Sequence, residues 1–162
     1  MALQFSDINE IIIDDIKEAL RLQGHHLTGA LERSLTPRES KNTDNYSISA
    51  EAFGYIKDLE EGVRPEHIAV DAQAIKEMTG YVELRMGYTG KYAVKVAIAI
   101  LNKQKKEGMP TKSSYQYSQT GERLDAVSDL FSENRQVYDN MIDDRVVDNL
   151  DQQFLTIKKG TI

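Results

Sequence analysis

The chain has 162 residues, which is a common length for one domain and enough to bury a core without disulfide staples. It carries 20 Lys and Arg against 26 Asp and Glu, and the resulting net charge of −6 disfavours tight binding of nucleic-acid phosphates. It contains no cysteine, which excludes disulfides, thiolate nucleophiles and cysteine-based metal sites.

The first predicted element is an amphipathic helix from Asp7 to Gly24. Asp7 with Glu10 three residues later fits a capping box, and Gly24 is typical of the residue that ends a helix. Apolar residues with helical spacing form one face of this helix: Ile8, Ile12, Ile16, Ala19 and Leu20, with Ile11 beside them. We expect this face to contribute to the core.

Two short strands are predicted next, over residues 30–38 and 46–53. In the second segment, apolar and polar residues alternate, as in a half-buried strand. The polar residues 39–45 between them are predicted to form the loop of a hairpin. A two-stranded hairpin is marginally stable alone, so we expect helices to cover one of its faces.

The middle of the chain alternates short helical segments and turns. Residues 53–61 indicate a helical turn that stops at Gly62, and residues 67–78 indicate a short helix. Residues 81–88 fit either a strand or an extension of that helix. Residues 91–106 predict a helix whose apolar face is wide enough to be buried on more than one side.

The end of the chain is predicted to be one long helix. Residues 108–119 lack periodicity and indicate a loop or an extended arm. Residues 122–154 then combine an apolar stripe with an acidic face, with a break near Asn134, and residues 156–162 indicate a flexible tail. The elements together predict an α+β fold: an N-terminal amphipathic helix, a small antiparallel hairpin, and a long C-terminal helix packed on it. Residues 1–162 form one domain, whose core is about 5–101 and 120–155.

Histidines are the usual acid–base residues, and the chain has three of them. His25 and His26 are adjacent in a turn, so their rings point in different directions, and His67 is far away in sequence. No H-x-E or H-x-x-x-H pattern supplies a metal site. We therefore expect exposed loop histidines and not catalytic or metal-binding ones.

Acidic pairs occur on the last helix, at Asp139 with Asp143 and at Asp144 with Asp148. Paired carboxylates can do acid–base work or bind a cation, but these lie opposite the apolar stripe and predict a solvated face. The glycines form neither a Walker motif nor a dinucleotide fingerprint. We predict no catalytic, cofactor-binding or metal residues, no cofactor, and no enzymatic activity.

One basic cluster is interleaved with aromatic residues, a composition that can contact nucleic acid. On an acidic chain, a solvated helix end is the favoured interpretation of this cluster. Its members are Lys103, Lys105, Lys106, Lys112, Tyr115 and Tyr117.

Three features in sequence carry a family resemblance. Residues 27–34 read T-G-x-L-x-x-S after the first helix, residues 52–65 contain a Tyr followed by Glu-x-Gly, and a long helix closes the chain. In this order they resemble the tail-completion, or neck, proteins of tailed bacteriophages, a family of small head–tail joining proteins. Residues 66–119 depart from the family pattern, because they insert a further helix and an arm.

The resemblance implies a non-enzymatic virion protein of the head–tail connector that forms a ring between the portal or adaptor and the tail. Its implied partners are copies of itself, the portal or adaptor and tail proteins, and genomic DNA that passes without sequence-specific binding, with no membrane. It would be made in the bacterial host cytoplasm and located in the neck or tail of the virion. The acidic helix would line the channel, where negative charge lets DNA pass.

Three alternatives remain from the sequence. One is a small non-viral adaptor module that forms a dimer. Another is a different part of the phage neck, such as an adaptor, a stopper or a tail terminator. The last is an enzyme that uses the acidic cluster with a metal ion.

Overall fold

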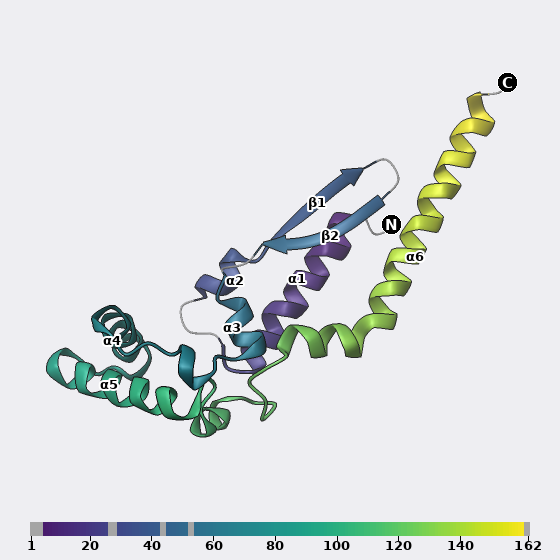
Figure 1. Ribbon diagram of the computed structural model, residues 1–162. Helices are drawn as coiled ribbons and strands as arrows, with labels where there is room; N and C mark the ends of the chain where they lie inside the picture. Colours follow the sequence, from purple (N-terminus) through teal and green to yellow (C-terminus); the bar gives the residue numbers. More distant parts are fainter. Residues whose placement is uncertain (1–4, 26–28, 43–44, 52–53, 161–162) are drawn as a thin grey trace.

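The computed structural model describes residues 5–25, 29–42, 45–51 and 54–160. The elements in chain order are α1 (Phe5–Leu22), α2 (Ala30–Ser34), β1 (Thr36–Asn42), β2 (Asn45–Glu51), α3 (Ile56–Glu61), the 3-10 helix η1 (Pro65–His67), α4 (Ala72–Met86), α5 (Gly90–Glu107), the 3-10 helix η2 (Lys112–Tyr117) and α6 (Ala126–Gly160). The molecule is elongated, with the α4–α5 pair at one end and the C-terminus of α6 at the other (Figure 1).

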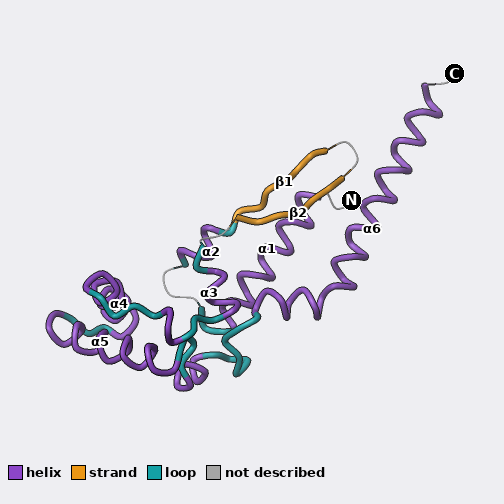
Figure 2. Tube along the Cα trace, in the orientation of Figure 1, coloured by secondary structure: helices purple, strands orange, loops and turns teal. Residues whose placement is uncertain are grey.

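The predicted α+β fold is wrong, because the described part of the chain is predominantly helical. Its strands make only the antiparallel ribbon β1–β2, paired from Thr36 with Glu51 to Asn42 with Asn45, and no sheet forms a core layer (Figure 2). The long C-terminal helix packs mainly on α1. The main core forms where the apolar faces of α1 and α6 pack against each other, so its architecture is that of one helix packed on another.

Part of the predicted first strand is helical. Residues 30–34 form α2, and Leu31 and Leu35, four residues apart, are both buried. A spacing of four residues places two side chains on one face of a strand as well as of a helix, so the apolar pattern alone did not distinguish the two. The strand β1 starts later than predicted and extends into the polar segment expected to be a loop.

The main core forms around the isoleucine face of α1. Its buried residues are Ile8, Ile12, Ile13, Ile16 and Leu20 of α1, Leu31, Leu35, Ala126 and Tyr138. Ile13 lies outside the predicted stripe, and its burial follows from the contacts that α1 makes with both α6 and the hairpin. The hydroxyl of buried Tyr138 donates a hydrogen bond to Asp15 at 2.8 Å, and burial together with this bond raises the pKa of Tyr138.

Helix α1 ends at a glycine C-cap, as the sequence predicts, and a segment distant in sequence also contacts this end of the helix. Gly24 adopts φ +77, and the N–H of His25 donates to the carbonyl of Leu20 at 2.8 Å, as in a Schellman motif. The N–H of Gln119 donates to the carbonyl of Leu22 at 2.8 Å. The segment 108–119, predicted to be a loop or arm, thus contains η2 and ends against α1.

Glu60 of α3 caps the first turn of α6. Its carboxylate accepts hydrogen bonds from the backbone N–H groups of Val127 at 3.0 Å and Ser128 at 2.7 Å, while its carbonyl accepts from Asp125 at 3.1 Å. These N–H groups have no partner within their own helix, and the positive end of the helix dipole favours a carboxylate there. Glu60 therefore joins two helices that are far apart in sequence.

Gly62 ends α3, as the sequence predicts, in a conformation that is almost restricted to glycine. Its φ and ψ are +75° and 174°, and a Cβ at this position would lie 2.7 Å from the carbonyl oxygen of Met109. The next residue, Val63, exchanges two backbone hydrogen bonds with Met109, of 2.7 and 2.8 Å. This contact ties the start of the α4–α5 region to its end.

The α4–α5 pair has a small core of its own, built from Val82, Ala93 and Ala97. The residues 81–88 that fitted either strand or helix belong mostly to α4, which continues to Met86. The small alanine side chains allow the two helices to approach closely. α6 also runs further than predicted, to Gly160, through the start of the segment expected to be a flexible tail.

We predict that Glu60→Ala lowers the free energy of unfolding by about 1–2 kcal/mol, because it removes the cap of α6. The matched control is Glu61→Ala, since Glu61 is exposed and its ion pair with Lys57, at 3.8 Å, should contribute under about 0.5 kcal/mol. Urea denaturation followed by circular dichroism measures both. Equal losses in the two variants would contradict the assigned role of Glu60.

Gly62→Ala should lower the free energy of unfolding by about 1–3 kcal/mol, because alanine is strained at this φ and its Cβ meets the carbonyl of Met109. Gly80→Ala is the opposite control. Gly80 lies inside α4, and a Cβ added there would have no atom within 4 Å, so alanine should raise stability by about 0.5–1 kcal/mol. A gain in stability for Gly62→Ala, measured in the same assay, would refute the strain argument.

Candidate assembly surfaces

The C-terminal half of α6 carries an exposed apolar face, which we call the α6 tip face. It consists of Val146, Val147, Leu150, Phe154 and Ile157, all more than 40% exposed. Phe154 is 68% exposed and Ile157 66%. Figure 1 shows this half of α6 projecting away from the other helices. Covering one such large side chain completely is worth about 1.5–3 kcal/mol, so the face favours a partner.

The tip face lies on the side of α6 away from its packed face. Tyr138, Met141 and Ile142 contact the main core. Rotation by about 100° per residue places Leu150 and Phe154 roughly opposite them around the helix axis. The same helix therefore has one apolar face for its own fold and a second one that the described residues of the chain leave uncovered.

A second group of exposed apolar side chains lies on the α4–α5 pair. Leu84 is 69% exposed and Tyr92 58%, and Tyr88 packs edge to face on Tyr92 with ring centroids 4.9 Å apart. We call Leu84, Tyr88 and Tyr92 the α4–α5 outer surface. The sequence predicts burial of α5 on more than one side, but the described residues bury only the side with Ala93, Ala97 and Leu101.

The two regions have opposite charge. Helix α5 carries five Lys against one Glu, a balance of +4, and all six side chains are exposed. Residues 139–151 of α6 carry five Asp against one Arg, a balance of −4. Lys158 and Lys159 follow in the last turn of α6 and reduce the balance of residues 139–160 to −2. The chain thus has a basic helix at one end of the molecule and a weaker acidic balance on the C-terminal half of α6.

No known protein family matches this chain, and no curated protein or solved structure is significantly similar to it. Within the described residues, no helix is both long and apolar enough to cross a membrane.

The histidines are placed apart. His25 lies beyond the end of α1, and its Nε2 lies 3.2 Å from the carbonyl oxygen of Arg123, a distance at which an Nε2–H group donates. His67 ends η1 and is exposed, and His26 lies outside the described residues. Burial lowers the pKa of His25, the neighbouring Arg123 guanidinium lowers it further, and Glu60 acts in the opposite sense. His25 therefore belongs to a structural junction.

Three of the four aspartates in the acidic pairs of α6 are exposed, as the sequence predicts, whereas Asp148 is partly buried. Asp139, Asp143 and Asp144 are exposed, and Asp139 forms an ion pair with Arg135 at 3.7 Å. Among the described residues, no three His, Asp or Glu side chains lie together in a group that could hold a metal ion. The basic cluster is split between the end of α5 and η2, with Lys103 donating a hydrogen bond to Ser113 at 2.6 Å.

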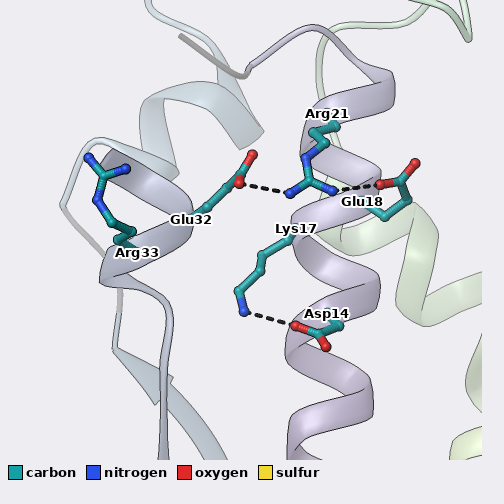
Figure 3. Close-up of a pocket in the computed structure, with 6 residues that line it drawn as sticks. All are labelled: Asp14, Lys17, Glu18, Arg21, Glu32 and Arg33. Carbon is teal, nitrogen blue, oxygen red and sulfur yellow. Dashed lines mark hydrogen bonds and ion pairs between the residues drawn. The ribbon is translucent and has the colours of Figure 1, made fainter. Parts of the chain in front are cut away.

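A shallow polar depression lies between α1 and α2 (Figure 3). Arg21 bridges Glu18 at 3.1 Å and Glu32 at 3.0 Å, while Lys17 pairs with Asp14 at 2.8 Å. With Arg33, the lining holds three acidic and three basic side chains, so the charges balance. The ion pairs tie α2 to α1 and leave no net charge to attract a ligand.

Sequence reasoning missed the α6 tip face because it joined all apolar residues of α6 into one stripe. Val147, Leu150, Phe154 and Ile157 recur at intervals of three, four and three residues, which is the spacing of a helix–helix seam. Each step of four residues from Tyr138 through Ile142 to Phe154 turns the stripe by about 40°, so its far end faces another side of the helix. The signal for a second face was present in the sequence.

We predict that acidification destabilises the protein through His25. The folded state disfavours the charged ring, whereas the unfolded chain takes up a proton near its ordinary pKa of about 6.5. The stabilising contribution is therefore complete above about pH 6.5 and is lost as the pH falls below that value.

Urea denaturation at about pH 8 and pH 5.5 tests this expectation. His25→Gln keeps a donor for the carbonyl of Arg123 but does not titrate, so its stability should fall less on acidification than that of the wild type. His67→Gln, at an exposed position, should behave as the wild type. Equal pH dependence in wild type and His25→Gln would count against a role for His25.

Proposed function

We propose that this chain is a structural subunit of the head–tail connector, or neck, of a tailed bacteriophage, and that it forms a ring between the portal or adaptor and the tail. The observation that carries the proposal is the presence of two different uncovered apolar surfaces at opposite ends of one chain. Two unlike surfaces on each copy make a heterologous contact, and such contacts close into rings when the rotation allows it.

The segment that resembles the neck proteins supports the proposal through its structural role. Within residues 52–65, the Glu-x-Gly motif supplies Glu60, which caps α6, and Gly62, which permits the close approach to Met109. The motif thus builds a structural junction. In the other resembling segment, residues 27–34, the residues Ala30–Ser34 form α2 where the resemblance implies the entry to a strand, and residues 27 and 28 lie outside the described part.

The charge distribution supports a channel through which DNA passes. Asp144 and Asp151 are exposed on a different side of α6 from the tip face. In a ring, this side would present carboxylates to the channel, where they repel phosphates and prevent adhesion. The proposed location is the neck of the virion, after synthesis in the bacterial host cytoplasm.

A second candidate function is a non-viral adaptor module that forms a dimer. The seam spacing of Val147, Leu150, Phe154 and Ile157 favours it, because two copies of such a stripe can pack on each other. A dimer of this kind has a two-fold axis and uses the same surface on both subunits. A ring and a two-fold dimer differ in symmetry, so the symmetry of the assembled particle distinguishes the connector from the adaptor module.

We predict that the purified protein forms closed rings of one copy number, seen by negative-stain electron microscopy and weighed by light scattering after size-exclusion chromatography. Leu150→Asp should abolish the rings, because it places a charge within the α6 tip face. Val137→Asp is a matched control: Val137 is 48% exposed and Leu150 49%, on the same helix but another face. A particle that is only a two-fold dimer would refute the connector proposal.

A further inference from the structure

We infer that the α6 tip face of one copy docks on the α4–α5 outer surface of the next copy, with α6 antiparallel to the neighbour's α5. The inference rests on the proposed self-assembly and adds which two surfaces meet and in which direction. The occupant of the tip face is thus a second copy of this chain.

The contact must form between copies. In one chain, the α4–α5 pair and the C-terminal half of α6 lie at opposite ends of the molecule (Figure 1). Leu84 and Tyr92 at one end and Phe154 at the other are among the most exposed apolar side chains of the described residues. A single helix laid along a helix pair makes a three-helix packing that covers both surfaces.

Charge complementarity selects this pairing over the two symmetric ones. An α6–α6 contact would oppose two stretches, residues 139–160, of charge −2 each, and an α5–α5 contact would oppose two helices of charge +4. The unlike pairing brings the lysines of α5 to the aspartates of α6. Like charges in contact cost free energy and unlike charges steer association, so the head-to-tail pairing is favoured.

The order of residues along each helix sets the direction. On α6 the exposed stripe starts with Asp139 and Asp143 and continues into the apolar tip face, which Lys158 and Lys159 follow. On α5, Tyr92 lies near the start with Lys91 and Lys95, and three of the five lysines lie at the end, at positions 103, 105 and 106. The antiparallel direction brings Tyr92 to the tip face and this larger group of lysines to Asp139 and Asp143.

The spacing along the two stripes also matches. Asp143 and Phe154 are 11 residues apart, and so are Tyr92 and Lys103, which is about 16 Å along either helix. One register therefore pairs Phe154 with Tyr92 and Asp143 with Lys103 at the same time. The two contacts reinforce each other.

Two one-sided variants test the inference. The α6-side variant carries Leu150→Asp and Phe154→Asp, and the α5-side variant carries Leu84→Asp and Tyr92→Asp. All four side chains are exposed, so both variants should fold, which circular dichroism and thermal melting check. Each should self-associate roughly 100-fold or more weakly than wild type, because charges enter an apolar contact.

The decisive measurement is a mixture of the two variants, followed by native mass spectrometry with one variant mass-tagged. Each variant keeps one intact surface, so a head-to-tail contact yields a 1:1 dimer that cannot grow. Wild-type-like self-association of the α5-side variant alone would indicate an α6–α6 contact and overturn the inference. A mixture that stays monomeric, or a wild-type protein that is monomeric at every concentration, would also overturn it.

Cysteine pairs test the direction, since the natural chain has no cysteine to interfere. Oxidation of the double variant Tyr92→Cys with Phe154→Cys should yield a ladder of covalent oligomers, as should Lys103→Cys with Asp143→Cys. The crossed pairs, Tyr92→Cys with Asp143→Cys and Lys103→Cys with Phe154→Cys, should stay monomeric. A ladder from the crossed pairs alone would overturn the antiparallel register.

The experiments can refute the docking inference and the connector proposal independently of each other. Rings without the 1:1 dimer or the expected cross-links would refute the inference and leave the connector standing. The 1:1 dimer and the cross-links without closed wild-type rings would do the reverse.

Discussion

The packing of α6 on the isoleucine face of α1 is the contact on which the rest of the molecule depends, and the two helices differ in length. Helix α1 has 18 residues and α6 has 35, or about 27 and 52 Å. The shorter helix can cover only part of the longer one. The remaining turns of α6 project, and the apolar side chains of the tip face are exposed there. The surface proposed for assembly is thus a consequence of this mismatch.

The second constraint is the junction where α3, α6 and the α4–α5 region meet. Glu60 satisfies N–H groups at the start of α6, and Gly62 lets the chain pass close to Met109. Together they hold the α4–α5 pair at a defined end of the molecule, far from the tip of α6. A rigid separation of two complementary surfaces is what a repeating head-to-tail contact requires.

The aspartates of α6 have two roles in this picture. Asp139 and Asp143 share the side of the helix that continues into the tip face, where the lysines of a neighbouring α5 would meet them. Asp144 and Asp151 point to another side, which suits contact with solvent or with a channel. In the proposed assembly, the aspartates that first suggested acid–base chemistry would instead select one partner and repel phosphates.

The sequence by itself determined the elements whose signals are local. The stripe and the terminal Gly24 of α1, the end of α3 at Gly62 and the long last helix follow from helical spacing and from backbone conformations that favour glycine. The 3-4-3 spacing of the tip face was also readable. Tertiary structure decided what required knowledge of partners: that residues 30–34 are helical, that Glu60 caps a helix more than sixty residues away, that the segment 108–119 ends against α1, and which apolar face of α6 is covered. A sequence pattern shows that a face is apolar, but only the positions of the other elements decide whether that face is buried.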